Sequence, residues 1–316
     1  MTPNRGVQRE PAVVDWKLFR AVSAEIGRDP DLVQGAGGNV SLKHEGVLWV
    51  KASGKWLADA DDSDIFVPVA SESARSRALA GEDDFAASVI GAAGLKPSIE
   101  TGLHALLPQR VVLHVHSINV LCHAVIEAGE QALQPLLAGI PWRWVPYARP
   151  GAPLTRAIEL VADIDSTDPL VLVLANHGLV IAADRLDEAQ ALLATVEHAL
   201  HRASRIASSS STLARAAELA NRIGGRLPKD ESVNRLALDS TALEVARVGA
   251  LYPDHVVFLG SGAVSRAATE LDGFDWAELD APYVIVPGFG VIVRRDITAN
   301  AAVSYTHLTL PTNREV

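Results

Sequence analysis

The sequence is poor in the residues that crosslink a chain and in long apolar runs. Among its 316 residues there is one cysteine, Cys122, and aromatic residues make up only 5%. A single cysteine excludes an internal disulfide and every zinc site built from several cysteines. The longest apolar runs, such as Leu170–Ala175, are far shorter than the roughly 20 residues that cross a bilayer. The N-terminal residues lack the apolar stretch of a secretory signal. We therefore expect a soluble cytoplasmic protein.

Positive charge is also scarce. The chain has 28 Lys and Arg against 38 Asp and Glu, a formal net charge of −10. This balance gives no general attraction to nucleic acid or to an anionic membrane, so neither is expected as a partner. An anionic small molecule would have to be met by a local cluster of donors. Hydrophobic residues make up 48%, enough for a sizeable core in a domain of about 200 residues and a smaller companion.

Three glycines lie close together in the segment GAGGNVS, residues 35–41. A dinucleotide-binding loop would follow an apolar strand, carry a third spaced glycine and open a helix, and this segment does none of these. A phosphate-binding loop of the Walker type would need Gly-Lys-Ser or Gly-Lys-Thr, which is absent. Two interpretations remain: a turn whose N–H groups, with Asn39 and Ser41, hold an anion, or a tight turn without a ligand.

Two histidines are separated by one residue in the β-branched segment VVLHVHS, where His114 and His116 fall on the same face of a predicted strand. A third, His177, falls in the turn after another buried strand. Three imidazoles with an open fourth position are typical of catalytic zinc. The alternative is that a His-x-His pair on a strand is structural.

Glu100 and His104 are four residues apart in a helix predicted over residues 98–107, with Ser98 as its N-cap. Both side chains could reach a metal, or His104 could pack beneath the helix.

A serine-rich stretch, residues 208–212, indicates a boundary. Beyond it, LYPDHVVFLG and PYVIVPGFGVIVRR predict short strands of a small α/β appendage. Residues 303–316, VSYTHLTLPTNREV, do not continue the preceding pattern and resemble translated sequencing-adapter readthrough. We expect a domain over 1–207, a linker and helix over 208–235, a small α/β domain over 236–302, and a non-native tail over 303–316.

Four segments in order resemble the class II aldolase/adducin family: GAGGNVSLK, LWVKASGKWL, SIETGLHALLPQRVVLHVHS and ANHGLVIAADRLDEA. The resemblance runs from about Asp15 to Arg202. The later segments LYPDHVVFLG and VPGFGVIV resemble longer members related to rhamnulose-phosphate aldolase. The resemblance implies a three-layer α/β/α domain with a central, mostly antiparallel sheet. It also implies a homotetramer with sites near the subunit interfaces.

The resemblance carries site residues over position by position. It implies Glu100 as the acid/base residue, and zinc or another divalent metal as the cofactor. The implied zinc ligands are His114, His116 and His177, and the implied anion-binding positions are Gly38, Asn39, Ser53, Gly54 and Ser98. Lys51 and Lys55 are candidates to add positive charge beside them, or are solvated lysines.

The sequence departs from the family pattern at two places. Ile99 stands where fuculose-phosphate aldolases have a second serine, so the substrate's anionic end is left open between a phosphate and another acid. The proton-donating tyrosine of the family has no clear counterpart, and Tyr147 matches a different tyrosine.

The resemblance implies a zinc-dependent aldehyde-lyase that cleaves a ketose phosphate or related sugar acid, with zinc stabilising the charge that develops as the C–C bond breaks. A 4-epimerase or a dehydratase on the same fold is the alternative within enzymes. A non-catalytic, adducin-like assembly module is the alternative outside them, although such a module would not need the three histidines and Glu100 together.

Overall fold

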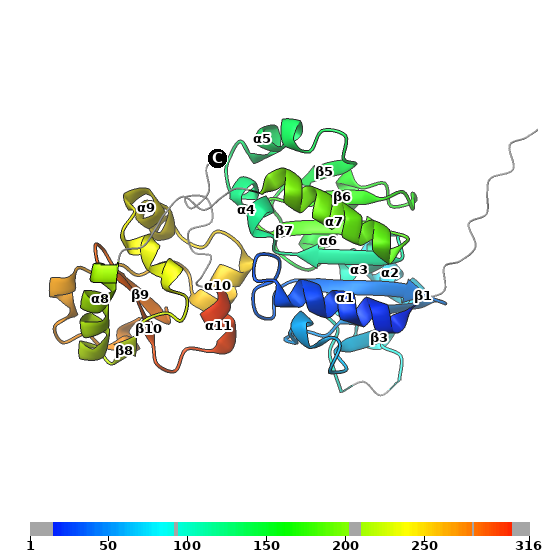
Figure 1. Ribbon diagram of the computed structural model, residues 1–316. Helices are drawn as coiled ribbons and strands as arrows, with labels where there is room; N and C mark the ends of the chain where they lie inside the picture. Colours follow the sequence, from blue (N-terminus) through cyan, green and yellow to red (C-terminus); the bar gives the residue numbers. More distant parts are fainter. Residues whose placement is uncertain (1–14, 92–93, 202–209, 280, 305–316) are drawn as a thin grey trace, which may run out of the picture.

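The computed structural model describes residues 15–91, 94–201, 210–279 and 281–304 (Figure 1). The described residues before 202 contain seven strands: β1 (Asn39–His44), β2 (Val47–Lys51), β3 (Phe66–Ala70), β4 (Val111–Val115), β5 (Trp142–Val145), β6 (Leu170–Leu174) and β7 (Gly178–Ala183). The helices among them are α1 (Trp16–Arg28), α2 (Ser71–Leu79), α3 (Thr101–Leu106), α4 (Ile118–Ala124), α5 (Gly129–Leu136), α6 (Ala152–Val161) and α7 (Leu186–Leu200). Short 3₁₀ turns lie at Leu57–Asp59 and Ala86–Ser88.

These strands form one sheet in the order β3-β2-β1-β4-β7-β6-β5. Only β5 and β6 run parallel, and every other neighbouring pair is antiparallel. The predicted α/β fold with a central, mostly antiparallel sheet is confirmed. The β1–β4 register sets Asn39 opposite His114, which places the end of the glycine segment beside the His-x-His strand.

Helices cover both faces of this sheet. One core cluster joins α1, α4, α5 and α7 to alternate strand residues that include Val111, Leu113 and Val115 of β4. On the opposite face, α3 and α6 pack against a cluster that includes Val112, and α2 packs over β2 and β3. Since strand side chains alternate, His114 shares the face of Val112. The pair His114 and His116 therefore faces the side covered by α2, α3 and α6.

The C-terminal part forms a smaller sheet in the order β8-β10-β9. Its elements are α8 (Ser210–Arg222), β8 (Gly225–Arg226), α9 (Ser240–Val248), α10 (Pro253–Leu259), β9 (Tyr283–Val286), β10 (Gly290–Arg294) and α11 (Ala299–Ser304), with 3₁₀ segments at Glu231–Ala237, Ala268–Leu271 and Trp276–Glu278. Hydrophobic clusters fill both faces of this sheet. The division of the chain into domains stays a prediction.

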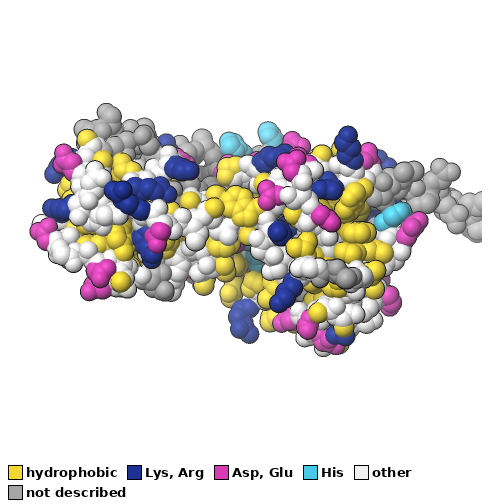
Figure 2. Space-filling model, turned by 90° about the horizontal axis from the view of Figure 1, so that it is seen from below, with side chains coloured by type: hydrophobic (Ala, Val, Ile, Leu, Met, Phe, Trp, Pro, Cys, Tyr) yellow, Lys and Arg dark blue, Asp and Glu magenta, His cyan; other side chains and the backbone are white. Residues whose placement is uncertain are grey.

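The strand predicted within LYPDHVVFLG is wrong, because the segment forms helix α10. Pro253 occupies the first helical turn, Asp254 is its acidic residue, and Gly260 follows the helix with φ of 91°. These are ordinary start and stop signals of a helix, which outweigh the β-branched pair Val256–Val257. In Figure 1, α10 and α11 lie beside the loop that precedes β1, and Figure 2 shows hydrophobic side chains where the two parts of the molecule meet.

The predicted non-native tail falls almost wholly outside the described residues, because only Val303 and Ser304 belong to α11. Among the helices that the structure describes, none has both the length and the apolar character required to cross a membrane.

Candidate active site

The three histidines predicted as metal ligands lie together. His114 is the penultimate residue of β4, His116 follows that strand directly, and His177 precedes β7, the direct neighbour of β4. One ligand atom from each lies within 4.8 Å of the other two, and all three residues are buried. Their ring centroids are 5.0–5.3 Å apart with steep interplanar angles. The rings therefore surround a common point.

Hydrogen bonds orient two of the rings. His114 Nδ1 lies 3.0 Å from the carbonyl oxygen of Leu179, and His116 Nδ1 lies 2.6 Å from Asp254 Oδ2. Both acceptors place a hydrogen on Nδ1, so Nε2 is the nitrogen that each of these rings turns toward the cluster. The Nε2 atoms of His114 and His116 are buried and have no hydrogen-bond partner among the described residues. Buried nitrogen lone pairs without a donor suit a cation, so this set of residues fits a divalent metal.

Glu100 faces the same point. Its Oε1 lies 3.1 Å from His177 Nε2, and its Oε2 lies 3.3 Å from His114 Nε2. Burial acts to raise the pKa of the Glu100 carboxyl, but His114 and His177 outweigh burial and hold that pKa well below its usual range. The carboxyl is therefore ionised at neutral pH.

Glu100 is also the N-cap of α3, which begins at Thr101. The prediction of Ser98 as the N-cap is wrong. The Ser98 hydroxyl instead accepts a hydrogen bond from the Glu100 N–H at 3.2 Å, in the turn before the helix. A polar side chain that bonds two residues on commonly stabilises such a turn.

A chain of buried polar side chains fixes the Glu100 carboxylate. Asn39 Nδ2 donates to Glu100 Oε2 at 2.8 Å, and Asn39 Oδ1 is bonded to His104 Nε2. His104 Nδ1 is 2.8 Å from the Ser41 hydroxyl. Burial lowers the pKa of His104 well below its usual range, so its ring is neutral. His104 thus packs beneath the helix and supports Glu100 through Asn39, outside the histidine cluster.

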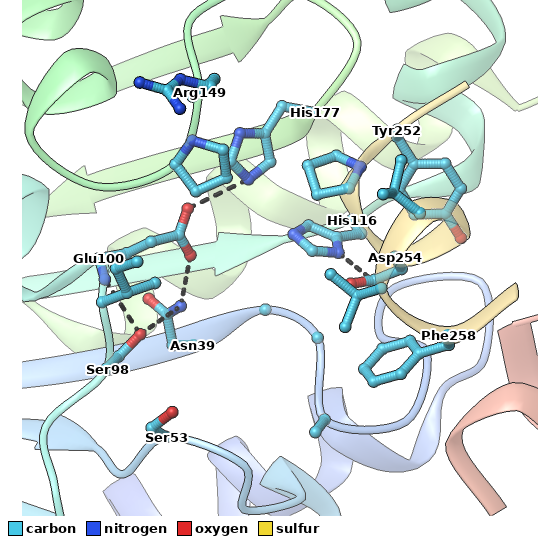
Figure 3. Close-up of a pocket in the computed structure, with 18 of the residues that line it drawn as sticks. Asn39, Ser53, Ser98, Glu100, His116, Arg149, His177, Tyr252, Asp254 and Phe258 are labelled. Carbon is cyan, nitrogen blue, oxygen red and sulfur yellow. Dashed lines mark hydrogen bonds and ion pairs between the residues drawn. The ribbon is translucent and has the colours of Figure 1, made fainter. Parts of the chain in front are cut away.

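Asn39, Glu100, His116 and His177 line a cavity of about 1060 Å³ (Figure 3). All six predicted substrate residues border it: Gly38, Asn39, Lys51, Ser53, Gly54 and Ser98. Their binding of an anion stays a prediction. Asn39 is already bonded to Glu100 and His104, and the Ser53 N–H donates to the Lys96 carbonyl at 2.9 Å, so Ser53 offers the cavity its hydroxyl.

Two glycines of the GAGGNVS segment are required by close packing. Gly38 has φ of 59°, and a Cβ there would lie 2.9 Å from the His114 carbonyl oxygen. At Gly37 a Cβ would lie 2.3 Å from Asp254 Oδ2. The segment therefore brings its backbone close to the strand of the histidines and to a residue more than 200 positions later in the chain.

Lys51 connects the glycine segment, residues 35–41, with the turn after β2 by hydrogen bonds. Its Nζ donates to the carbonyl oxygens of Ala36 at 3.0 Å and Lys55 at 2.7 Å. Burial lowers the pKa of Lys51 to about 8, although Glu100 and Asp254 act to raise it. Lys51 is 2% exposed, whereas Lys55 is exposed at the surface.

A pH dependence of stability follows for the metal-free protein. The ordinary pKa of 10.5 applies to Lys51 in the unfolded chain, and about 8 applies in the folded protein. Between these values the unfolded chain binds more protons, so Lys51 makes the free energy of unfolding rise with pH, by about 3 kcal/mol at most. Lys51→Met should lose this rise, and Lys55→Met should keep it. Urea unfolding of both variants between pH 8 and 10.5 measures the difference; equal slopes for Lys51→Met and the unaltered chain would contradict it.

The sequence did not point to several cavity residues, among them Arg149 and residues 250–254 and 256–258. Figure 3 shows Arg149 across the cavity from Ser53, with Tyr252, Asp254 and Phe258 on the α10 side. Tyr147 borders the cavity and is 59% exposed. Tyr252 is buried and donates its hydroxyl to Gln34 Oε1 at 3.2 Å, and burial raises the pKa of that hydroxyl well above its usual range.

Comparison with known proteins gives a family match. The family model described as the class II aldolase and adducin N-terminal domain matches residues 20–203. A curated relative in Bacillus subtilis (strain 168), named uncharacterized oxidoreductase YuxG, is 30% identical over 188 residues, which are 54% of this chain and 26% of that protein. The chain thus spans about a quarter of the length of this relative.

Two solved structures are also similar to part of the chain. The N-terminal class II aldolase domain of a conserved protein from Thermoplasma acidophilum is 26% identical with a TM-score of 0.50, over 63% of this chain and 98% of that one. YgbL from Klebsiella pneumoniae, titled a putative aldolase/epimerase/decarboxylase, is 21% identical with a TM-score of 0.43, over 60% and 89% of the two chains.

Proposed function

Because the chain belongs to the class II aldolase and adducin family, we propose that it is a divalent-metal-dependent aldehyde-lyase that cleaves a ketose phosphate or related sugar acid. One observation carries this proposal: the ionised Glu100 carboxylate lies 3.1 and 3.3 Å from two imidazoles of a buried three-histidine cluster. Both groups open onto one cavity, which could hold a sugar-sized substrate.

His114, His116 and His177 would hold the metal, and zinc is our proposal for its identity, since a site of three imidazole ligands suits it. When bound, the metal would supply Lewis-acid stabilisation for the negative charge that develops on the substrate as its C–C bond breaks. The protein itself would orient the ligands, because the Leu179 carbonyl oxygen and the Asp254 carboxylate hydrogen-bond the Nδ1 atoms of His114 and His116.

Glu100 would move the proton. In the cleavage direction a base removes the proton of the hydroxyl group on the carbon that becomes the aldehyde. An acid later gives a proton to the other fragment. An ionised, buried carboxylate beside the metal ligands suits the first step. Asn39 would hold Glu100 at this position through its hydrogen bond of 2.8 Å, with His104 and Ser41 behind it.

The substrate's anionic end has two candidate partners at the cavity wall. Ser53 and Ser98 lie on one side in Figure 3, and Lys51 also borders the cavity. Arg149 lies on the other side in Figure 3 and offers a forked donor that matches a carboxylate or a phosphate. Ile99, which is 56% exposed, presents an apolar side chain to the cavity beside Ser98. We propose that Arg149 contributes to binding the anion.

Arg149→Gln should raise KM for an anionic ketose about tenfold, as expected from the loss of one solvent-exposed charge-assisted hydrogen bond. The KM of an uncharged analogue should change little. Arg143→Gln is the matched control, because Arg143 is an exposed arginine six residues earlier that does not border the cavity. Steady-state kinetics on the two substrates measures both effects, and equal KM changes for charged and uncharged substrates would remove Arg149 from this role.

A cleavage screen tests the proposed function. The protein, with and without a chelator, is incubated with ketose phosphates and unphosphorylated sugar acids, and released aldehyde is measured. We expect chelator-sensitive release from at least one class. Metal-bound protein that releases no aldehyde but inverts or dehydrates a substrate would favour the epimerase or dehydratase alternative. Protein that binds no metal would favour a non-catalytic assembly role.

The homotetramer and the cytoplasmic location stay predictions, and light scattering would test the homotetramer.

A further inference from the structure

The C-terminal part of the chain reaches into the histidine cluster. Asp254, in the first turn of α10, places Oδ2 2.6 Å from His116 Nδ1, a contact between residues 138 positions apart. Both side chains are buried, at 4% and 6% exposure. Figure 3 shows Asp254 directed at His116 from the side opposite to Glu100. This carboxylate bonds the nitrogen that faces away from the cluster, and leaves Nε2 for a metal.

The segment that carries Asp254 is fixed at several points, each next to a residue of the cluster. Asn176, beside His177, donates to the Leu251 carbonyl at 3.1 Å. The Tyr252 hydroxyl donates to Gln34, which itself lies 3.4 Å from the His116 carbonyl oxygen. Tyr252 also packs on Ile118, Leu121 and Cys122 of α4. The Asp254 carboxylate therefore approaches the cluster from a segment that hydrogen bonds and packing hold in place.

The glycine segment leaves room for this contact. At Gly37 there is no side chain, and a Cβ would lie 2.3, 2.9 and 3.0 Å from the three carboxyl atoms of Asp254. At Gly35 a Cβ would similarly meet Asn300 of α11 at 2.7 Å. Two of the three glycines in this segment thus face the C-terminal part, which gives them a role apart from anion binding.

We propose that the C-terminal part completes the metal centre within the same chain, with Asp254 as the positioning residue for His116. A carboxylate behind a ligating imidazole fixes its tautomer and ring orientation and makes it a stronger ligand. The loss of such a partner typically weakens metal binding about 10- to 100-fold. The proposal rests on the metal site of the proposed function, and it concerns metal affinity rather than the reaction.

The test is the affinity of the full chain for Zn²⁺, measured at one pH by competition with a chromophoric chelator, together with the visible spectrum of the Co²⁺ form. Asp254→Ala should bind Zn²⁺ about 10- to 100-fold more weakly and shift the Co²⁺ bands. Asp254→Asn should recover part of the affinity, because its amide oxygen still accepts from Nδ1–H. Gly37→Ala should act in the same direction as Asp254→Ala, because its methyl group would displace the carboxylate.

Asp296→Ala is the matched control, because Asp296 belongs to the same part of the chain and its side chain is 69% exposed. It should bind Zn²⁺ as the unaltered chain does. If Asp254→Ala folds and binds Zn²⁺ with unchanged affinity, the proposal is wrong. If Asp254→Ala does not fold, the asparagine and Gly37 variants decide, and unchanged affinity in both overturns it. An unaltered chain without metal affinity would instead contradict the proposed function.

Discussion

Alanine at His114, His116 or His177 should abolish tight metal binding. Each substitution removes one of three inward nitrogen ligands, and the other two cannot replace it. Because loss of an outer partner already costs about 10- to 100-fold, loss of a ligand should cost more than about 100-fold. Metal content of the purified protein should fall from one divalent ion per chain to a small fraction of that. Thermal unfolding with and without added Zn²⁺ gives a second measurement, since a metal that binds the folded state raises the midpoint.

His198→Ala is the control for this series. His198 is exposed on α7, away from the cluster, so its loss should leave metal content and the Zn²⁺-dependent shift unchanged. The result for His177→Ala is simpler to interpret than the result for His116→Ala, because His116→Ala also leaves the buried Asp254 carboxylate without its partner. Full metal content in a folded His177→Ala protein would exclude the cluster as the metal centre.

Glu100→Gln should keep the metal and lose turnover. Glutamine preserves the shape of the side chain and can still accept the hydrogen bond from Asn39, but it cannot take up a proton. General acid–base groups contribute about 10²- to 10⁴-fold to rate, so kcat should fall by that factor. Metal content should remain near one ion per chain, because the three histidines are intact.

The kcat and the metal content of Glu100→Gln are best measured on the same sample, so that loss of metal is not mistaken for loss of proton transfer. Glu72→Gln, at an exposed position of α2, is the matched control and should leave kcat unchanged. A Glu100→Gln protein that retains both its metal and its kcat would remove Glu100 from proton transfer and leave the reaction to another group.

The parts of the site that depend on local pattern were predictable from the sequence. The period of two along a strand correctly predicted that His114 and His116 share a face. That His177 joins them depends on β7 pairing with β4, which spacing alone could not establish. The resemblance to a known family supplied that information.

The residues that the sequence did not reveal reach the cavity through tertiary docking. Arg149 lies in the segment before α6, and its approach to the cavity depends on how that segment crosses the sheet edge. Asp254 meets His116 across 138 positions, which no local rule could predict. The interpretation of LYPDHVVFLG as a strand also hid it, although Pro253 and Gly260 mark the ends of a helix.

The proposed metal centre is tested most directly by the position of a metal in crystals of the full chain soaked with Zn²⁺, from anomalous diffraction recorded on both sides of the zinc absorption edge. We predict one strong peak per chain, bounded by the His114, His116 and His177 rings and facing the Glu100 carboxylate. A fully occupied zinc at other residues, with the three rings bonded only to protein, would contradict the account.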